Sequence, residues 1–190
     1  MQVLRHFIVH VPKAVNDTMT LGDTEIFVDS RFNPFQHRVM AGEVVSVPSK
    51  YDTGVSVGDT LYFHHHVVMT PQLFDKEKDL YIVNYDPQGG HNTQAYLYKD
   101  KNGKLTAIQD WVFLDPIKEE GLKSSVIEVF TNEAPANRRG KVKFPSVALG
   151  EYGIEVGDVV YFVKNADYEM TIEGEKIWRM LHTSLEVVEK

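Results

Sequence analysis

GEVVSVPSKYDTGVSVGDTLYF, from Gly42 to Phe63, returns later in the chain as GKVKFPSVALGEYGIEVGDVVYF, from Gly140 to Phe162. In both copies a glycine opens an alternating strand, a Pro-Ser pair interrupts it, and Val-Gly-Asp turns the chain into a second hydrophobic strand. A self-similarity of this length, repeated at a domain-sized offset, is typical of duplicated domains. The sequence therefore predicts two related all-β units in tandem.

The composition is that of an ordinary globular protein, with 43% hydrophobic and 25% charged residues among 190. The chain contains no cysteine, which excludes disulfides and thiolate chemistry. No segment has the pattern of a signal peptide or of a membrane span, so we expect a cytoplasmic protein. The net charge of -7 argues against general binding to nucleic acid or to an anionic membrane.

Strand-like segments dominate the chain, and the turn residues between them favour barrels or sandwiches over a βαβ fold. We expect one domain over residues 1–117 and a second over 118–190, with the polar stretch from Pro116 to Lys123 as linker. Aligning the copies outward makes Phe7-Ile8-Val9 and Val126-Ile127 the equivalent first strands. On this alignment the first domain carries extra residues at 16–38 and an insertion at 64–104.

The second domain contains, in order, RRGKVKFPS, IEVGDVVYF, a short hairpin around Gly174 and the ending KIWRMLHTSLEVVEK. This order resembles the GroES co-chaperonin family, with its R-G-x-V strand, its V-x-V-G-D-x-V-x-F turn and strand, its hairpin and its terminal strand. The resemblance covers most of the second domain and, more loosely, residues 4–63 and 104–115. It implies two tandem GroES-like β-barrels, the first with a flexible loop and the 64–104 insertion, the second without a mobile loop.

The resemblance also implies a function. Members of the family are co-chaperonins that form homo-oligomeric rings, heptamers in the family pattern, and cap the folding chamber of a chaperonin ring in a nucleotide-dependent way. Their mobile loop binds the chaperonin through a short hydrophobic triplet, and residues 16–38 lie at that place. Ile26, Phe27 and Val28 are the corresponding apolar triplet in a polar setting, so they are the expected partner-binding residues. The alternative is an ordinary strand in which Ile26 and Val28 are buried.

Two other functions stay open from the sequence. One is a structural or assembly protein built on the same barrels, such as a virion component. The other is a metal-dependent enzyme, because strand alternation would place His64 and His66 on one face, where His91 or Asp86 could complete a metal site. A solvated or interface histidine strand is the simpler interpretation. Since no hydrolase or metalloprotease motif occurs, we expect no enzymatic activity, no cofactor and no metal.

Overall fold

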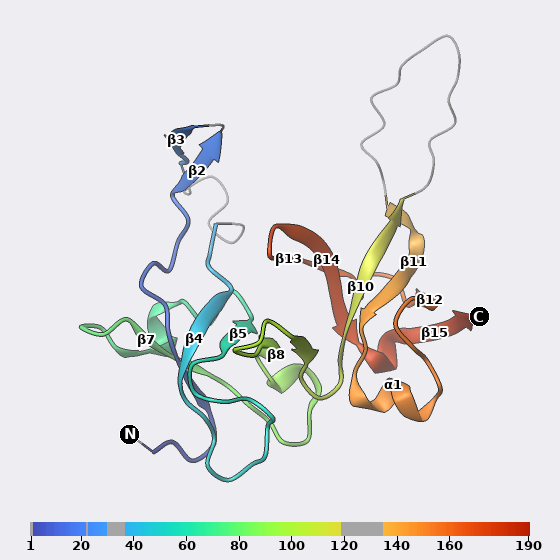
Figure 1. Cartoon of the computed structure of the whole chain (residues 1–190), viewed down its shortest axis with the longest axis horizontal. Coiled ribbons are helices and arrows are strands. Elements are labelled where there is room, and N and C mark those ends of the chain that lie inside the picture. Colours follow the sequence, from blue (N-terminus) through green and yellow to red (C-terminus); the bar gives the residue numbers. More distant parts are fainter. Residues whose placement is uncertain (1, 22, 30–36, 119–134) are drawn as a thin grey trace. The chain divides into compact units, whose positions relative to one another are not determined.

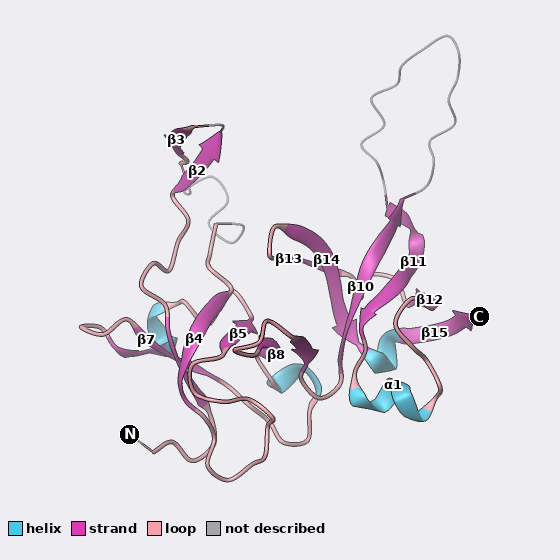
Figure 2. Cartoon of the chain, viewed as in Figure 1, coloured by secondary structure: helices cyan, strands magenta, loops and turns pink. Residues whose placement is uncertain are grey.

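The computed structural model describes residues 2–21, 23–29, 37–118 and 135–190. The chain divides into two compact units, Met1–Ile108 and Gln109–Lys190. Strands dominate both units, and the described residues contain one α-helix, α1 (Val147–Glu151), with three short 3-10 turns at Thr70–Gln72, Gly90–Asn92 and His182–Ser184. The all-β prediction is therefore confirmed, as Figure 2 shows.

The first unit is built on a seven-stranded antiparallel sheet with the order β6-β7-β1-β4-β5-β8-β9. Its strands are β1 (Phe7–His10), β4 (Ala41–Ser46), β5 (Thr60–Phe63), β6 (Leu73–Asp75), β7 (Leu80–Val83), β8 (Ala95–Lys99) and β9 (Leu105–Ala107). A separate hairpin consists of β2 (Thr18–Leu21) and β3 (Thr24–Phe27). Apolar side chains from β1, β4 and β5, among them Phe7, Val44 and Phe63, form the buried core of this unit.

The second unit is built on a six-stranded antiparallel sheet with the order β13-β14-β10-β11-β12-β15. Its strands are β10 (Trp111–Lys118), β11 (Pro135–Phe144), β12 (Val159–Phe162), β13 (Tyr168–Ile172), β14 (Glu175–Leu181) and β15 (Leu185–Glu189). Leu114, Val142, Phe162 and Trp178 are buried together in its core. In both sheets the β-branched and aromatic residues that favour strands supply this packing.

The repeated sequence adopts the same pairing in both sheets. Gly42 of β4 lies opposite Leu61 of β5, and Gly140 of β11 lies opposite Val160 of β12. On their other side, β4 pairs with β1 and β11 pairs with β10. The register also shifts at equivalent places in the two sheets. On β1 and β10 it shifts between Ile8 and Val9 and between Phe113 and Leu114. On β5 and β12 it shifts between Tyr62 and Phe63 and between Tyr161 and Phe162. Equivalent irregularities at equivalent positions mean that the two units share a detailed strand arrangement.

The Val-Gly-Asp turn is also built twice. Gly58 and Gly157 have φ angles of 89° and 100°, a conformation that favours glycine. Their amides donate to the carbonyl oxygens of Val44 and Val142, each at 2.8 Å. The aspartate that follows accepts a hydrogen bond from the backbone three residues earlier, at 2.8 Å for Asp59 and 3.0 Å for Asp158. The motif thus closes the turn before β5 and before β12.

The strand pairing corrects the expected domain boundary. Trp111–Lys118 pairs with β11 and β14, so it opens the second unit and does not close the first. The division accordingly falls after Ile108, not at the expected boundary between residues 117 and 118. By its partners and register, β10 is the counterpart of β1, and residues 119–134 connect β10 to β11 as residues 11–40 connect β1 to β4. The expected first strand at Val126-Ile127 lies outside the described residues.

Two further expectations differ from the structure. Residues 64–104 are not simply an insertion, because β6, β7 and β8 take the same places in the first sheet as β13, β14 and β15 take in the second. Among the described strands, only β9 of the seven-stranded sheet lacks a counterpart in the other sheet. Each sheet has two edge strands, so the described sheets are open and do not form closed barrels.

No helix in the described part of the chain is long and apolar enough to span a membrane.

Candidate partner-binding hairpin

The β2–β3 hairpin is carried on a short two-stranded stem that extends from β1 and β4. Val15 and Arg38 form an isolated antiparallel bridge in this stem. The Asn16 amide donates to the carbonyl oxygen of His37 at 2.6 Å, and the Val39 amide donates to that of Ala14 at 3.0 Å. The backbone therefore holds the two chain segments that lead to the hairpin against each other.

Beyond the stem, β2 and β3 pair with each other and not with the seven-stranded sheet. Thr18 lies opposite Phe27, and Leu21 lies opposite Thr24. The Val28 amide donates to the carbonyl oxygen of Asp17 at 2.7 Å and closes the open end of the hairpin. Figure 1 shows the hairpin apart from the strands of the sheet. Because isolated two-stranded hairpins are only marginally stable, the stem and the closing hydrogen bond support the pairing of β2 with β3.

The predicted triplet lies on β3 and just after it. The side chain of Phe27 is 83% exposed and that of Ile26 is 39% exposed, whereas Val28 is half-buried. Residues alternate between the two faces of a strand, so Ile26 and Phe27 point to opposite sides of the hairpin. The segment is a strand, as the alternative interpretation expected, but Ile26 is not buried in a core. An exposed aromatic side chain on a projecting hairpin is suited to contact another molecule.

Charged residues join the stem to the hairpin. The ammonium group of Lys13 lies 2.6 Å from the carboxylate of Asp17 and donates to the hydroxyl of Thr18 at 3.4 Å. The hydrogen bond from Lys13 holds the pKa of Asp17 below its ordinary value. Sequence reasoning did not identify this pair. Opposite charges four residues apart usually indicate a helix face, and this segment is not helical.

The histidine residues are arranged differently from the sequence prediction. Strand β5 ends at Phe63, so alternation along a strand does not place His64 and His66 on one face. The chain turns instead, with the Val67 amide donating to the carbonyl oxygen of His64 at 2.9 Å. This turn brings together His64, His65 and His66, whose candidate ligand atoms all lie within 4.8 Å of one another. Neither His91 nor Asp86, the expected third ligands, belongs to this group.

The basic side chains of β11 make contacts within the second unit. Lys143 donates to the carboxylate of Asp115 at 3.0 Å and also to that of Glu175. These two acceptors, Glu175 foremost, raise the pKa of Lys143 above its ordinary value. Arg138 lies 4.0 Å from the carboxylate of Glu186. Lys143 and Arg138 therefore have acidic partners within the second unit, and the hairpin remains the stronger candidate for a partner-binding surface.

Comparison with known proteins adds no assignment. No protein-family model matches the chain, and a search of curated proteins finds no match.

Proposed function

We propose that this chain is a co-chaperonin, a ring-forming lid that docks on a chaperonin ring through the β2–β3 hairpin and assists protein folding. The observation that carries the proposal is the exposure of Phe27, at 83%, and of Ile26, at 39%, on a hairpin that stands on its own stem. The resemblance of the duplicated strands and V-G-D turns to the GroES family supports the same assignment. Only the resemblance to this family identifies the partner as a chaperonin.

The chemistry of the hairpin fits a reversible contact. Full burial of a phenylalanine side chain stabilises a complex by about 1.5–3 kcal/mol, so a single hairpin would bind weakly. If several chains assemble into a ring, their hairpins engage together, and avidity can raise the affinity by a factor of about 10²–10⁴ without new contacts. Weak individual contacts on a ring thus give firm capping that can still be released. Self-assembly, as a heptamer in the family pattern, is part of this proposal.

The proposed lid performs no bond chemistry. It binds the nucleotide-loaded state of the chaperonin more tightly than the empty state, and it thereby shifts the chaperonin toward the closed chamber. The nucleotide belongs to the partner, so the chain itself requires no cofactor. The proposal places this activity in the cytoplasm, with no role for nucleic acid or membrane.

Native mass spectrometry tests the proposal directly. The purified chain would be measured alone, then with a chaperonin ring, and then with the ring and ATP. We expect a homo-oligomeric ring that joins the chaperonin only when nucleotide is present. A monomer or dimer that is indifferent to chaperonin and ATP would overturn the proposal and favour the structural or assembly role.

A further inference from the structure

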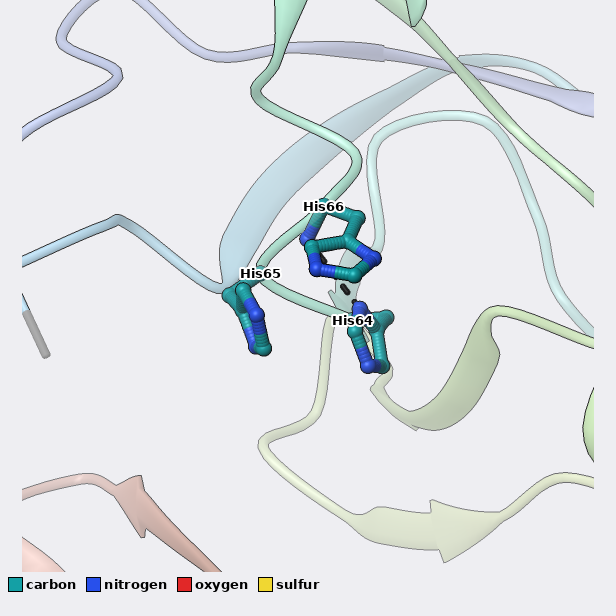
Figure 3. Close-up of side chains that lie close together, drawn as sticks. All are labelled: His64, His65 and His66. Carbon is teal, nitrogen blue, oxygen red and sulfur yellow. Dashed lines mark hydrogen bonds between the residues drawn. The ribbon is translucent and has the colours of Figure 1, made fainter. Parts of the chain in front are cut away.

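Three imidazole rings converge at the turn that follows β5 in the first unit. The ring centroids of His64, His65 and His66 are 4.2, 4.3 and 4.4 Å apart in the three pairs. Successive residues of a strand point to opposite faces, so three neighbouring side chains can meet only where the chain leaves the strand. The turn achieves this, because the Val67 amide donates to the carbonyl oxygen of His64 and the Met69 amide donates to that of His66. Figure 3 shows the three side chains close together.

From this arrangement we propose that His64, His65 and His66 form a binding site for a divalent transition metal ion, with Zn²⁺ as the first candidate. Their candidate ligand atoms all lie within 4.8 Å of one another, so modest side-chain rotations can direct three nitrogens to one ion. Three imidazoles satisfy three of the four positions that zinc takes in sites with an exchangeable fourth ligand. Imidazole nitrogen suits zinc, copper and nickel, whereas magnesium and calcium prefer oxygen.

The second unit indicates that the fold does not require these histidines. At the equivalent place it has Val163, Lys164 and Asn165, after the same irregularity at Phe162. The backbone at this place is also the same in both units. The His64 amide donates to the carbonyl oxygen of Gln94 at 3.0 Å, and the Val163 amide donates to that of Ser184 at 2.9 Å. A four-residue turn begins at this residue in both units, and the amides of Val67 and Ala166 close it by donating to the carbonyl oxygens of His64 and Val163. Three adjacent imidazoles are therefore an addition to a turn that forms without them.

Their accessibility is compatible with an ion from solution. His66 is exposed, and His64 and His65 are half-buried. The His66 amide donates to Nδ1 of His64 at 3.1 Å, which orients that ring. Coordination through Nδ1 of His64 would replace this hydrogen bond, and coordination through Nε2 would transfer the ring proton to Nδ1 and also break it. The His66 amide is thus a direct reporter of metal binding through His64.

The test uses the full chain, purified without a histidine tag and treated with a chelator. Calorimetric titration with Zn²⁺ should give saturable binding of one ion per chain, and Mg²⁺ should give none. The variant H66N removes one proposed ligand at an exposed position and should weaken zinc binding by at least about tenfold, because loss of even an outer-shell partner of a metal ligand costs about 10–100-fold. The variant H64V/H65K/H66N carries the sequence of the second unit and should abolish binding. His91→Asn is the matched control and should bind zinc as the unaltered chain does.

Circular dichroism should give the same folded spectrum for all variants. If the triple variant does not fold, the comparison of zinc binding by H66N and by the unaltered chain still tests the proposal. In a ¹H-¹⁵N spectrum, zinc should shift the His66 amide resonance of the unaltered chain. Absence of saturable zinc binding would overturn the proposal, and so would equal binding by H66N and the unaltered chain. A loss in H91N as large as that in H66N would also contradict it. None of these outcomes depends on the co-chaperonin proposal.

Discussion

Gly42 and Gly140 occupy the same crowded position in their two sheets. A Cβ atom on Gly42 would lie 2.9 Å from the carbonyl oxygen of His10, and one on Gly140 would lie 2.9 Å from Cβ of Leu114. His10 and Leu114 belong to the equivalent strands β1 and β10. The close approach of these strands explains why the repeated block opens with glycine in both copies.

Replacement of either glycine by alanine should destabilise the unit that contains it. Real Cβ atoms do not approach other atoms this closely, so β1 or β10 must shift, at a cost of about 1–3 kcal/mol. Thermal and urea unfolding of Gly42→Ala and Gly140→Ala would measure the loss. Gly150→Ala is the control, because no atom outside its chain neighbours and its own helix backbone lies within 4 Å of the added Cβ, and alanine favours the helix. Equal stability of all three variants would contradict the packing argument.

Phe27→Asp should abolish association with a chaperonin ring in the presence of ATP and leave the fold unchanged. Because Phe27 is 83% exposed, its substitution should alter the free energy of unfolding by less than about 0.5 kcal/mol. Phe74→Asp changes another exposed phenylalanine, on β6 and outside the hairpin, and should retain association. Gel filtration with the chaperonin measures capture. An unfolded Phe27→Asp protein would mean that this side chain has a structural role.

Removal of the turn aspartates should destabilise the two units unequally. The Asp59 carboxylate accepts the Ser56 amide and its residue is only 4% exposed, whereas Asp158, its counterpart, is half-buried. A backbone amide that loses its acceptor is more costly when it is buried than when water can replace the acceptor. The free energy of unfolding should therefore fall by about 2 kcal/mol in Asp59→Ala and by about 1 kcal/mol or less in Asp158→Ala. Urea titration would rank the variants. A larger loss in Asp158→Ala would refute the burial argument.

The stability of the first unit should fall as the pH falls below neutral, in part through His6. Burial, together with the nearby charge of Arg5, holds the pKa of His6 below its ordinary value of 6.5. The unfolded chain therefore binds a proton near pH 6.5 that the folded chain does not yet bind, and the free energy of unfolding decreases from that pH downward. The Tyr85 amide also donates to Nδ1 of His6 at 3.4 Å, which requires the unprotonated nitrogen.

His6→Asn retains an acceptor close to that nitrogen and cannot titrate. Urea unfolding between pH 7.5 and 5.5 should therefore show a smaller loss of stability in His6→Asn than in the unaltered chain. The other histidines contribute equally to the pH dependence of both proteins. The difference between the two slopes of unfolding free energy against pH therefore gives the contribution of His6. Identical slopes would show that His6 has the same pKa in the folded and unfolded states.

The sequence predicted those features that depend on local patterns. The duplicated block predicted the strands that form β4, β5, β11 and β12 and the V-G-D turns between them, because these features are encoded within a short stretch. The family resemblance made Ile26-Phe27-Val28 a candidate, although it did not place the triplet on a paired hairpin. Turns can be predicted from the sequence, since they depend on particular residues at particular positions.

Features that depend on distant pairing were not predictable in the same way. The sequence places most of β10 in the first domain, because β10 shares no distinctive residue with β1 and contains Pro116, a residue typical of linkers. Pro116 lies opposite Gly140 on β11, while the pairing of β10 with β14 extends only from Trp111 to Leu114. A proline is tolerated at such a locally unpaired edge, because the missing amide has no partner there. The convergence of His65 with its neighbours likewise depends on where β5 ends.

The shared register of the two sheets has a consequence for refolding. Since Gly42 lies opposite Leu61 and Gly140 lies opposite Val160 in equivalent strand pairs, we expect that β4 could also pair in frame with β12 during refolding. The irregularities that fix the register within each sheet do not distinguish the two copies. Chain connectivity does, because closing residues 47–59 between β4 and β5 costs about 2 kcal/mol less entropy than closing residues 47–158 between β4 and β12. The short connection within each repeated block thus directs each half of the chain to its own strands before the halves can exchange them.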